Sequence, residues 1–246
     1  MKHKINGNYV IWRYTLMRKK KFDKLFICLY VIIEAILLIE IKKTENQGHP
    51  GIDIDNIFMF LAIVVNTIVV LYYYLKYGAK RKEQHENLVI LALILNLFAD
   101  LFLSFLDTDA MMIVGFAFFC ALEAVYTLYL KSPKSSILAR IVLFSLGCAL
   151  TYVNGLLNIT NAFGILNLSI VLFNVIDAWR SKNMNPGFMF KLGITLFCIG
   201  DYCIVLRTLT GGFIHDAAAF LVWVTYVPTQ VLIVLNYIKK LNLNKK

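Results

Sequence analysis

Long hydrophobic runs separated by short polar connections repeat along the whole chain. Each run holds about twenty residues, the length that an α-helix needs to cross the hydrocarbon core of a membrane. The pattern predicts eight spans, at residues 25–41, 57–77, 88–106, 110–130, 137–154, 159–179, 188–207 and 217–238. The connections are too short to hold a soluble domain. We therefore expect an all-α, polytopic membrane bundle of eight transmembrane helices.

The polar ends of the chain complete this organisation. A basic and aromatic segment at 1–24 precedes a single transmembrane domain at 25–238, and a basic tail follows at 239–246. We expect the first of these segments to lie along the cytoplasmic membrane interface, because it mixes aromatic and cationic side chains.

The transmembrane domain also resembles a duplication, with halves at about 25–130 and 137–238 on either side of Pro133. Asp100 and Asp201 are 101 positions apart, and Tyr126 and Tyr226 are 100 apart. Because each half has four spans, both copies run in the same direction through the membrane. The sequence therefore predicts two parallel four-helix repeats.

The positive charge is distributed unequally between the two sides of the predicted membrane. With eight crossings, 22 of the 25 Lys and Arg fall on the side of the termini, and only Lys42, Lys43 and Arg207 fall on the other. This is the positive-inside pattern. It predicts a multi-pass protein of the cell membrane with both termini cytoplasmic. We expect the basic face to contact anionic lipid, and we expect no nucleic-acid partner.

Aromatic and sulfur-containing residues fit the same picture. All five cysteines lie within the spans, so we expect no disulfide. Several aromatic residues gather at the cytoplasmic ends of spans, where we expect an interfacial aromatic belt. These residues are Tyr72, Tyr73, Tyr74, Tyr77, Tyr126, Tyr129, Trp179 and Tyr237.

Two carboxylates lie deep inside spans, and they are the first candidates for a function. Asp100 lies roughly 18 Å from the cytoplasmic start of its span and Asp201 roughly 20 Å from the start of its own. A charged side chain at this depth is costly and by default marks a functional site. Glu123 and Glu34 are also within spans, and for Glu34 we favour a structural role.

Further polar and aromatic residues are predicted to surround these carboxylates. Tyr226 enters from the outer side to the depth of the aspartates, with Gln230 one turn deeper on the same face. Phe119, Glu123 and Tyr126 share one helix face, and Asn96 lies one turn before Asp100. We therefore expect a polar pocket in which Asp100 and Asp201 are catalytic. Its substrate-binding or positioning residues would be Glu123, Tyr226, Gln230, Tyr126, Asn96 and Phe119.

Two close carboxylates in a medium of low dielectric constant do not both ionise readily, so one of them retains its proton. Such a pair supplies a general acid and a general base, which suits hydrolysis of an acid-labile C–O bond. The histidines needed for a histidine-based zinc site or a serine–histidine hydrolase are missing from the spans. All four histidines lie outside the spans, and no HExxH or GxSxG motif is present. We expect no metal and no cofactor.

At these residues the chain resembles the YhhN family of eight-span membrane proteins, which includes the lysoplasmalogenases. The family has an aspartate late in the third span, like Asp100. It has Gly, Phe, His and Tyr in the fourth span, where this chain has Gly115, Phe119, Glu123 and Tyr126. Its Phe-x-x-Ser-Asp motif corresponds to Phe197–Asp201, with Gly200 in place of serine. Its Tyr-x-x-Ala-Gln motif corresponds to Tyr226–Gln230, with Thr229 in place of alanine.

The resemblance implies hydrolysis of the vinyl ether bond of a lysoplasmalogen. One aspartate would protonate the vinyl carbon, and the other would activate water. Two other readings remain open. The same acids suit a proton- or cation-coupled transporter, or a ligand-binding membrane protein, acting on a small molecule. Glu123 in place of the family histidine also suits a catalytically inert member of the family.

Overall fold

The computed structural model describes residues 5–44, 54–78, 84–105, 108–181 and 186–243. These residues form eight α-helices and one π-helical turn, and no β-strand. The α-helices are α1 (Ile5–Thr44), α2 (Ile54–Tyr73), α3 (Gln84–Phe105), α4 (Asp109–Leu130), α5 (Lys134–Val153), α6 (Ile159–Arg180), α7 (Phe188–Leu209) and α8 (Gly212–Leu243). The π-helical turn η1 (Tyr74–Gly78) extends α2. The predicted helical bundle is confirmed.

Six of the described helices, α2 and α4 to α8, are long and apolar enough to cross a membrane. In α3 the apolar stretch is shorter, at Asn87–Leu103. The apolar half of α1 contains Glu34 and Glu40, and α1 is not among the six. Lipid offers no hydrogen-bond partners to backbone groups. At the starts of α4 and α6, a free backbone N–H group is therefore bonded by a side chain of the short connection before it. Thr108 caps α4 by accepting from the backbone of Met111 at 3.3 Å, and Asn158 caps α6 by accepting from Asn161 at 2.7 Å.

The helices of the two halves have matching neighbours. In the first half α1 packs against α2, α2 against α3 and α3 against α4, and in the second half α5 packs against α6, α6 against α7 and α7 against α8. The contacts between halves match as well, since α4 packs against α6 and α8 against α2. Two parallel repeats related by a rotation would produce this set of neighbours.

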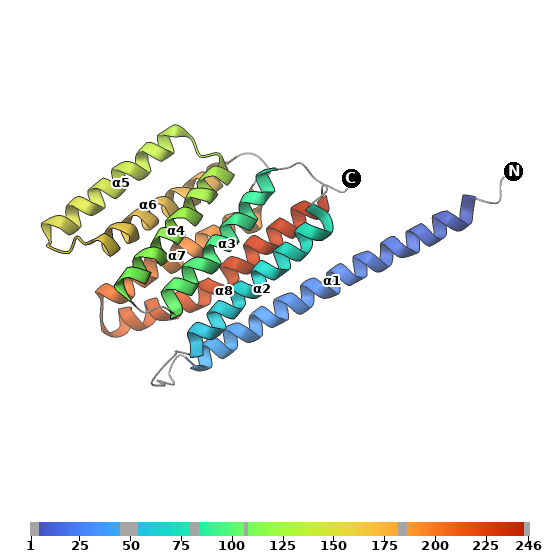
Figure 1. The fold of residues 1–246 in the computed structure, drawn as a ribbon, viewed down its shortest axis with the longest axis horizontal. Helices are drawn as coiled ribbons and strands as arrows, with labels where there is room; N and C mark the ends of the chain where they lie inside the picture. Colours follow the sequence, from blue (N-terminus) through green and yellow to red (C-terminus); the bar gives the residue numbers. More distant parts are fainter. Residues whose placement is uncertain (1–4, 45–53, 79–83, 106–107, 182–185, 244–246) are drawn as a thin grey trace.

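The first helix of each half departs from this symmetry. In the described part of the chain, α1 packs against α8 as well as α2, whereas α5 packs mainly against α6. Figure 1 shows α1 and α5 at opposite edges of the bundle. Much of the outer face of α5 is exposed and apolar, including Leu138, Ile141 and Leu150, as expected of a helix that faces lipid.

The basic and aromatic segment predicted at 1–24 is described by the structure from Ile5 onward, as part of a longer helix. From Ile5 onward this segment is helical and continuous with α1, which has 40 residues. A helix of that length is about 60 Å long, more than the thickness of a bilayer, which is about 40–45 Å including its headgroups. Figure 1 shows its N-terminal half projecting beyond the other helices. Residues 8–22 contain no proline or glycine, so nothing local ends the helix before the apolar run begins.

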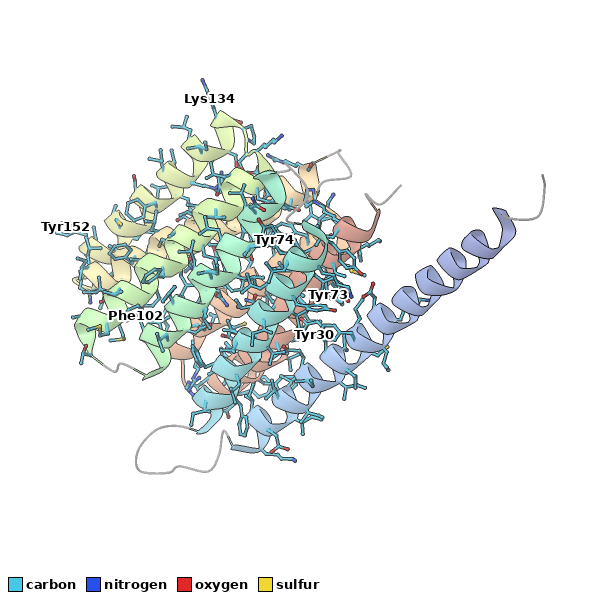
Figure 2. All side chains as sticks on the ribbon, turned by 45° about the vertical axis from the view of Figure 1, so that its right-hand side comes forward. Tyr30, Tyr73, Tyr74, Phe102, Lys134 and Tyr152 are labelled. Atoms are coloured by element: carbon cyan, nitrogen blue, oxygen red, sulfur yellow. The ribbon has the colours of Figure 1, made fainter. Side chains whose placement is uncertain are left out.

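The assignment to an interfacial aromatic belt is wrong for several tyrosines, because they are buried between helices. Tyr73, Tyr126, Tyr129 and Tyr237 are at most 3% exposed and pack between helices, whereas Trp179 is 48% exposed. Figure 2 shows Tyr73 among the side chains between α2 and α1. Two of these hydroxyls have hydrogen-bond partners inside the protein, since the Tyr129 hydroxyl accepts from Lys240 and the Tyr73 hydroxyl acts as a donor. The Tyr73 hydroxyl donates to the backbone carbonyl of Asp23 at 3.5 Å.

Candidate active site

The Asp100 carboxylate joins α3 to α8. The Tyr226 hydroxyl donates a hydrogen bond to Asp100 Oδ2 at 2.6 Å, across 126 positions of sequence. Asp100 is buried, and among the described residues no Lys or Arg forms an ion pair with it. The structure therefore brings together two of the predicted site residues, with a neutral phenol as the partner of the acid.

The Asp201 carboxylate is held by a residue that the sequence analysis missed. Asn167 on α6 donates from Nδ2 to Asp201 Oδ2 at 2.7 Å. Asp201 lies close enough to both Asp100 and Glu123 for their charges to interact. A signal for Asn167 was present in the sequence, because it follows Asn66 by 101 positions, the same separation as between the two aspartates.

Glu123 is fully buried on α4 and is bound by a second asparagine of α6. Asn174 Nδ2 donates to Glu123 Oε2 at 2.7 Å and to the Glu123 backbone carbonyl at 2.9 Å. The carbonyl of the same amide accepts from Thr127 Oγ1 at 2.8 Å and from Arg140 Nη2 at 2.7 Å. The orientation of Asn174 is therefore determined by donors on one side and by Glu123 on the other.

This network continues to a buried ion pair between α5 and α6. Arg140 lies 2.9 Å from Asp177, and Ser136 donates to the same carboxylate at 2.7 Å. In the charge distribution, Arg140 is one of the 22 cationic residues on the side of the termini. Its position inside an apolar run, six residues after the start of α5, was the signal that it is a buried residue. A hydrogen-bonded chain thus runs from Glu123 to the predicted cytoplasmic ends of α5 and α6.

Phe119 and Tyr126, both predicted to line the site, pack α4 against α7. The Phe119 ring lies 6.1 Å from that of Phe197, and the Tyr126 ring meets that of Phe190 edge-on at 5.4 Å. Tyr126 and Tyr226 are equivalent in the proposed repeat, but their surroundings differ. Tyr226 binds an aspartate of the other half, whereas Tyr126 packs against an aromatic ring.

Asn96, one turn before Asp100, and Thr229 and Gln230, one turn after Tyr226, are buried and carry polar atoms without partners. Asn96 is 0% exposed, and neither its Nδ2 nor its Oδ1 has a hydrogen-bond partner. Gln230 Oε1 and Thr229 Oγ1 also have none. Glu123 Oε1 and the amide oxygen of Asn167 are also buried without a hydrogen-bond partner. The cluster therefore has unused hydrogen-bonding capacity on several helices.

Glu34 joins α1 to α2 and lies beside the site. Asn66 Nδ2 donates to Glu34 Oε1 at 3.0 Å, and the Asn66 amide oxygen accepts from Tyr30. These bonds fasten α1 to α2. The charge of Glu34 also interacts with Tyr226, so the acid belongs to the edge of the cluster.

The helices of the site approach closely at Gly200, next to Asp201. A Cβ atom at Gly200 would lie 2.8 Å from Thr225 Oγ1. Thr225 therefore occupies the space that a side chain at Gly200 would need. Thr225 donates to the backbone carbonyl of Leu221 at 2.8 Å, within α8.

Metal and disulfide chemistry find no support in the described residues. Among them no group of three or more His, Cys, Asp or Glu could hold a metal ion. Their five cysteines are all free thiols, as the sequence predicts.

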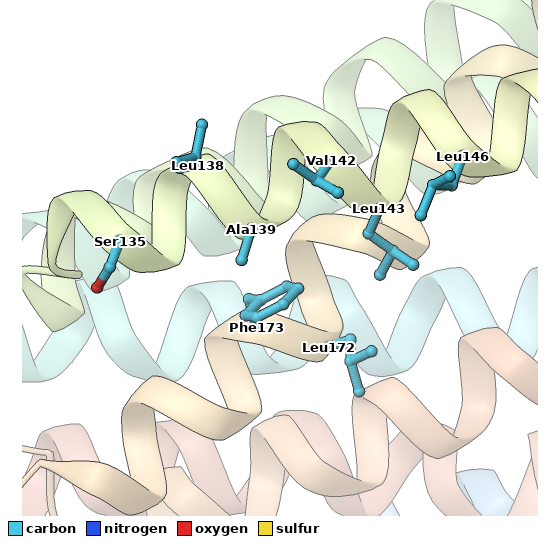
Figure 3. A pocket seen from close by; sticks show the side chains of 8 residues that line it. All are labelled: Ser135, Leu138, Ala139, Val142, Leu143, Leu146, Leu172 and Phe173. Carbon is cyan, nitrogen blue, oxygen red and sulfur yellow. The ribbon is translucent and has the colours of Figure 1, made fainter.

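A groove of about 560 Å³ between α5 and α6 has no carboxylate in its lining. Its lining, seen in Figure 3, consists of Ser135, Leu138, Ala139, Val142, Leu143, Leu146, Leu172 and Phe173. None of these side chains is titratable, so the groove lacks the groups for acid–base chemistry. The candidate site is therefore the polar cluster in the interior and not the groove.

Comparison with known proteins identifies one family. The model of the YhhN family matches residues 58–237, which include every predicted site residue. No curated protein and no solved structure is significantly similar to the chain.

Proposed function

Because the chain belongs to the YhhN family, we propose that it is an integral membrane hydrolase similar to the lysoplasmalogenases. It would cleave an ether-type bond of a lysophospholipid, with Asp100 and Asp201 as the catalytic pair. The observation that carries this proposal is that the carboxylates of Asp100 on α3 and Asp201 on α7 lie near each other in the interior. Their charges interact, and the hydrogen-bond partner of each is a neutral donor.

The proposed reaction divides the acid and base roles between the two aspartates. The carboxyl group that retains its proton transfers it to the alkene carbon that is not bonded to the ether oxygen, and an oxocarbenium ion forms at the other alkene carbon. The ionised carboxylate accepts a proton from water as that water adds to the cationic carbon. The resulting hemiacetal separates into an aliphatic aldehyde and the glycerophospho-alcohol. No metal or cofactor is needed for any of these steps.

The surrounding residues support this chemistry by position. The Tyr226 hydroxyl orients Asp100, and Asn167 orients Asp201. Glu123, held by Asn174, adds a third carboxyl group near Asp201. Phe119 and Tyr126 pack α4 against α7 and so position the helix that carries Glu123.

The test is aldehyde release from a 1-alkenyl lysophospholipid by the purified protein in lipid nanodiscs. Asp100→Asn and Asp201→Asn should each lower the rate by about 10²–10⁴-fold, the usual contribution of a general acid or base. Glu40→Gln, at the exposed Glu40–Lys43 pair of α1, is the matched acid-to-amide control and should retain the wild-type rate. Wild-type turnover in both aspartate variants, in folded protein, would exclude the catalytic pair.

One observation favours a second candidate, a proton- or cation-coupled transporter. The chain of polar contacts from Glu123 through Asn174 to Arg140 and Asp177 extends from the cluster towards one end of the bundle. A transporter would drive pH-dependent uptake into proteoliposomes and release no aldehyde from the ether lipid. Aldehyde release without such uptake would favour the hydrolase.

A further inference from the structure

The Asp100–Tyr226 hydrogen bond determines how α3 and α8 are aligned. The two helices run in opposite directions, since an odd number of connections separates them along the chain. One turn from Asp100 towards the start of α3 is Asn96, and one turn from Tyr226 towards the end of α8 is Gln230. Both steps lead towards the same end of the bundle, and residues four apart share a helix face. Asn96 and Gln230 therefore lie at the same level, about one helical turn, ~5–6 Å, from the acid.

Asn96 is unusual among the buried amides of the described residues, because both of its amide atoms lack a partner. Asn66, Asn167 and Asn174 each donate to a carboxylate. Asn96, in contrast, is completely buried with both amide atoms unpartnered, and Gln230 Oε1 is buried without a donor. Thr229, beside Gln230, has a buried hydroxyl that also lacks a partner. Burying an amide without partners is unfavourable, so the arrangement indicates a polar ligand group at this level.

The hydrogen-bonding groups of Asn96, Thr229 and Gln230 indicate which kind of ligand group would bind them. Asn96 offers one donor and one acceptor, Gln230 offers an acceptor, and the Thr229 hydroxyl can do either. All three are uncharged, and neither Asn96 nor Gln230 has a Lys or Arg among its described hydrogen-bond partners. A phosphate would need cationic partners, and an ammonium group would need carboxylates or aromatic faces. A neutral hydroxyl, which both donates and accepts, matches the set.

We propose that Asn96, Thr229 and Gln230 form a subsite for the free hydroxyl of the substrate glycerol, on the carbon next to the ether-bearing carbon. The proposal rests on the proposed function and extends it to substrate selection. One helical turn from Asp100 is a span that the few bonds between the vinyl carbon and this hydroxyl can cover. The subsite would accept lysolipids with a free hydroxyl and reject those in which it is acylated or missing, because the buried amides would then stay unpaired.

The test measures binding, so that it is independent of turnover. The probe is a lysophospholipid with a saturated alkyl ether, which the vinyl ether reaction cannot cleave, compared with its 2-deoxy analogue. Wild-type protein in nanodiscs should bind the deoxy analogue at least ~100-fold more weakly, as expected when a hydroxyl-binding site loses its partner. Asn96→Leu and Gln230→Met should each reduce the discrimination below about tenfold by weakening binding of the hydroxyl-bearing lipid.

Thermal unfolding without lipid supplies a second readout and a matched control. Asn96→Leu should leave the melting temperature unchanged or raise it, because it removes amide groups that have no partners in the protein. Asn66→Leu should lower it, because the Asn66 amide donates to both Glu34 and the Ala62 carbonyl. Equal binding of the two lipids by the wild type, or full discrimination in a folded Asn96→Leu or Gln230→Met protein, would overturn the subsite.

The two proposals fail in different ways. If the vinyl ether lipid is cleaved but the wild type binds both saturated probes equally, the hydrolase stands and the subsite is wrong. If discrimination depends on Asn96 and Gln230 but no aldehyde is released, the subsite exists and the hydrolytic function is wrong.

Discussion

The buried ion pair between Arg140 and Asp177 gives the sharpest prediction about stability. The two groups are 2.9 Å apart, and their side chains are 7% and 4% exposed. Asp177→Asn removes the only carboxylate that forms an ion pair with Arg140 among the described side chains. An uncompensated buried charge of this kind typically costs about 3–5 kcal/mol. We therefore expect Asp177→Asn to reduce the free energy of unfolding by about this amount.

Two comparisons separate charge compensation from packing. Replacing the pair together, with Arg140→Met and Asp177→Leu, removes both charges and should recover most of the loss, since apolar replacement of a buried pair is often neutral or stabilising. The Glu40–Lys43 pair has a similar length, 2.7 Å, but its side chains are 36% and 60% exposed. Glu40→Gln should therefore change stability by less than ~1 kcal/mol.

The measurement is reversible unfolding in mixed micelles, with denaturing detergent as the variable and helix content as the signal. The free energies of the single and double variants form a double-mutant cycle, which isolates the interaction of the pair. If Asp177→Asn costs no more than Glu40→Gln, the argument from buried charge is refuted. If the double variant is as unstable as Asp177→Asn, the loss arises from packing.

Two further predictions concern the site itself. Gly200→Ala should cost about 1–3 kcal/mol by overpacking, because its Cβ would lie 2.8 Å from Thr225 Oγ1. Gly164→Ala, where nothing lies within 4 Å of the added Cβ, is the control for unfolding measurements. Tyr226→Phe removes the 2.6 Å hydrogen bond to Asp100 and should slow aldehyde release about 10- to 100-fold, as expected for a hydrogen bond to a charged group. Tyr152→Phe, on an exposed tyrosine, should leave the rate unchanged.

Either control can contradict its prediction. Equal stabilities of Gly200→Ala and Gly164→Ala would mean that α7 and α8 separate readily beside Asp201. Equal rates in Tyr226→Phe and Tyr152→Phe would mean that the hydrogen bond to Asp100 does not matter for the chemistry.

The depth of the site residues could be predicted because a helix converts sequence position into distance along its axis. This is why Tyr226 was expected at the level of Asp100, which it indeed contacts. Which faces of the helices meet was harder to predict. Tyr73 and Tyr129 were assigned to an interfacial belt, yet both are buried between helices. In a helix that is apolar all round, periodicity does not show which face contacts protein, because lipid is as apolar as a leucine side chain.

The partners of the acids were missed for the same reason. Asn167 and Asn174 lie on α6, and their relation to Asp201 and Glu123 depends on the rotation of α6 about its axis. The contrast between Tyr126 and Tyr226 has a similar origin. The proposed repeat makes the two positions equivalent, but different neighbours give one an aspartate and the other a phenylalanine ring.

The sequence by itself determined the helices and the depth at which each polar side chain lies, because both follow from local spacing along the chain. It also located the two aspartates as candidates, because a buried charge is costly wherever the helix packs. Only the tertiary structure decided which side chains meet, including the bond from Asn167 to Asp201 and the chain from Glu123 to Arg140. Those pairings depend on the rotation and neighbours of each helix, and in a membrane these are set by packing between helices and not by the hydrophobic pattern.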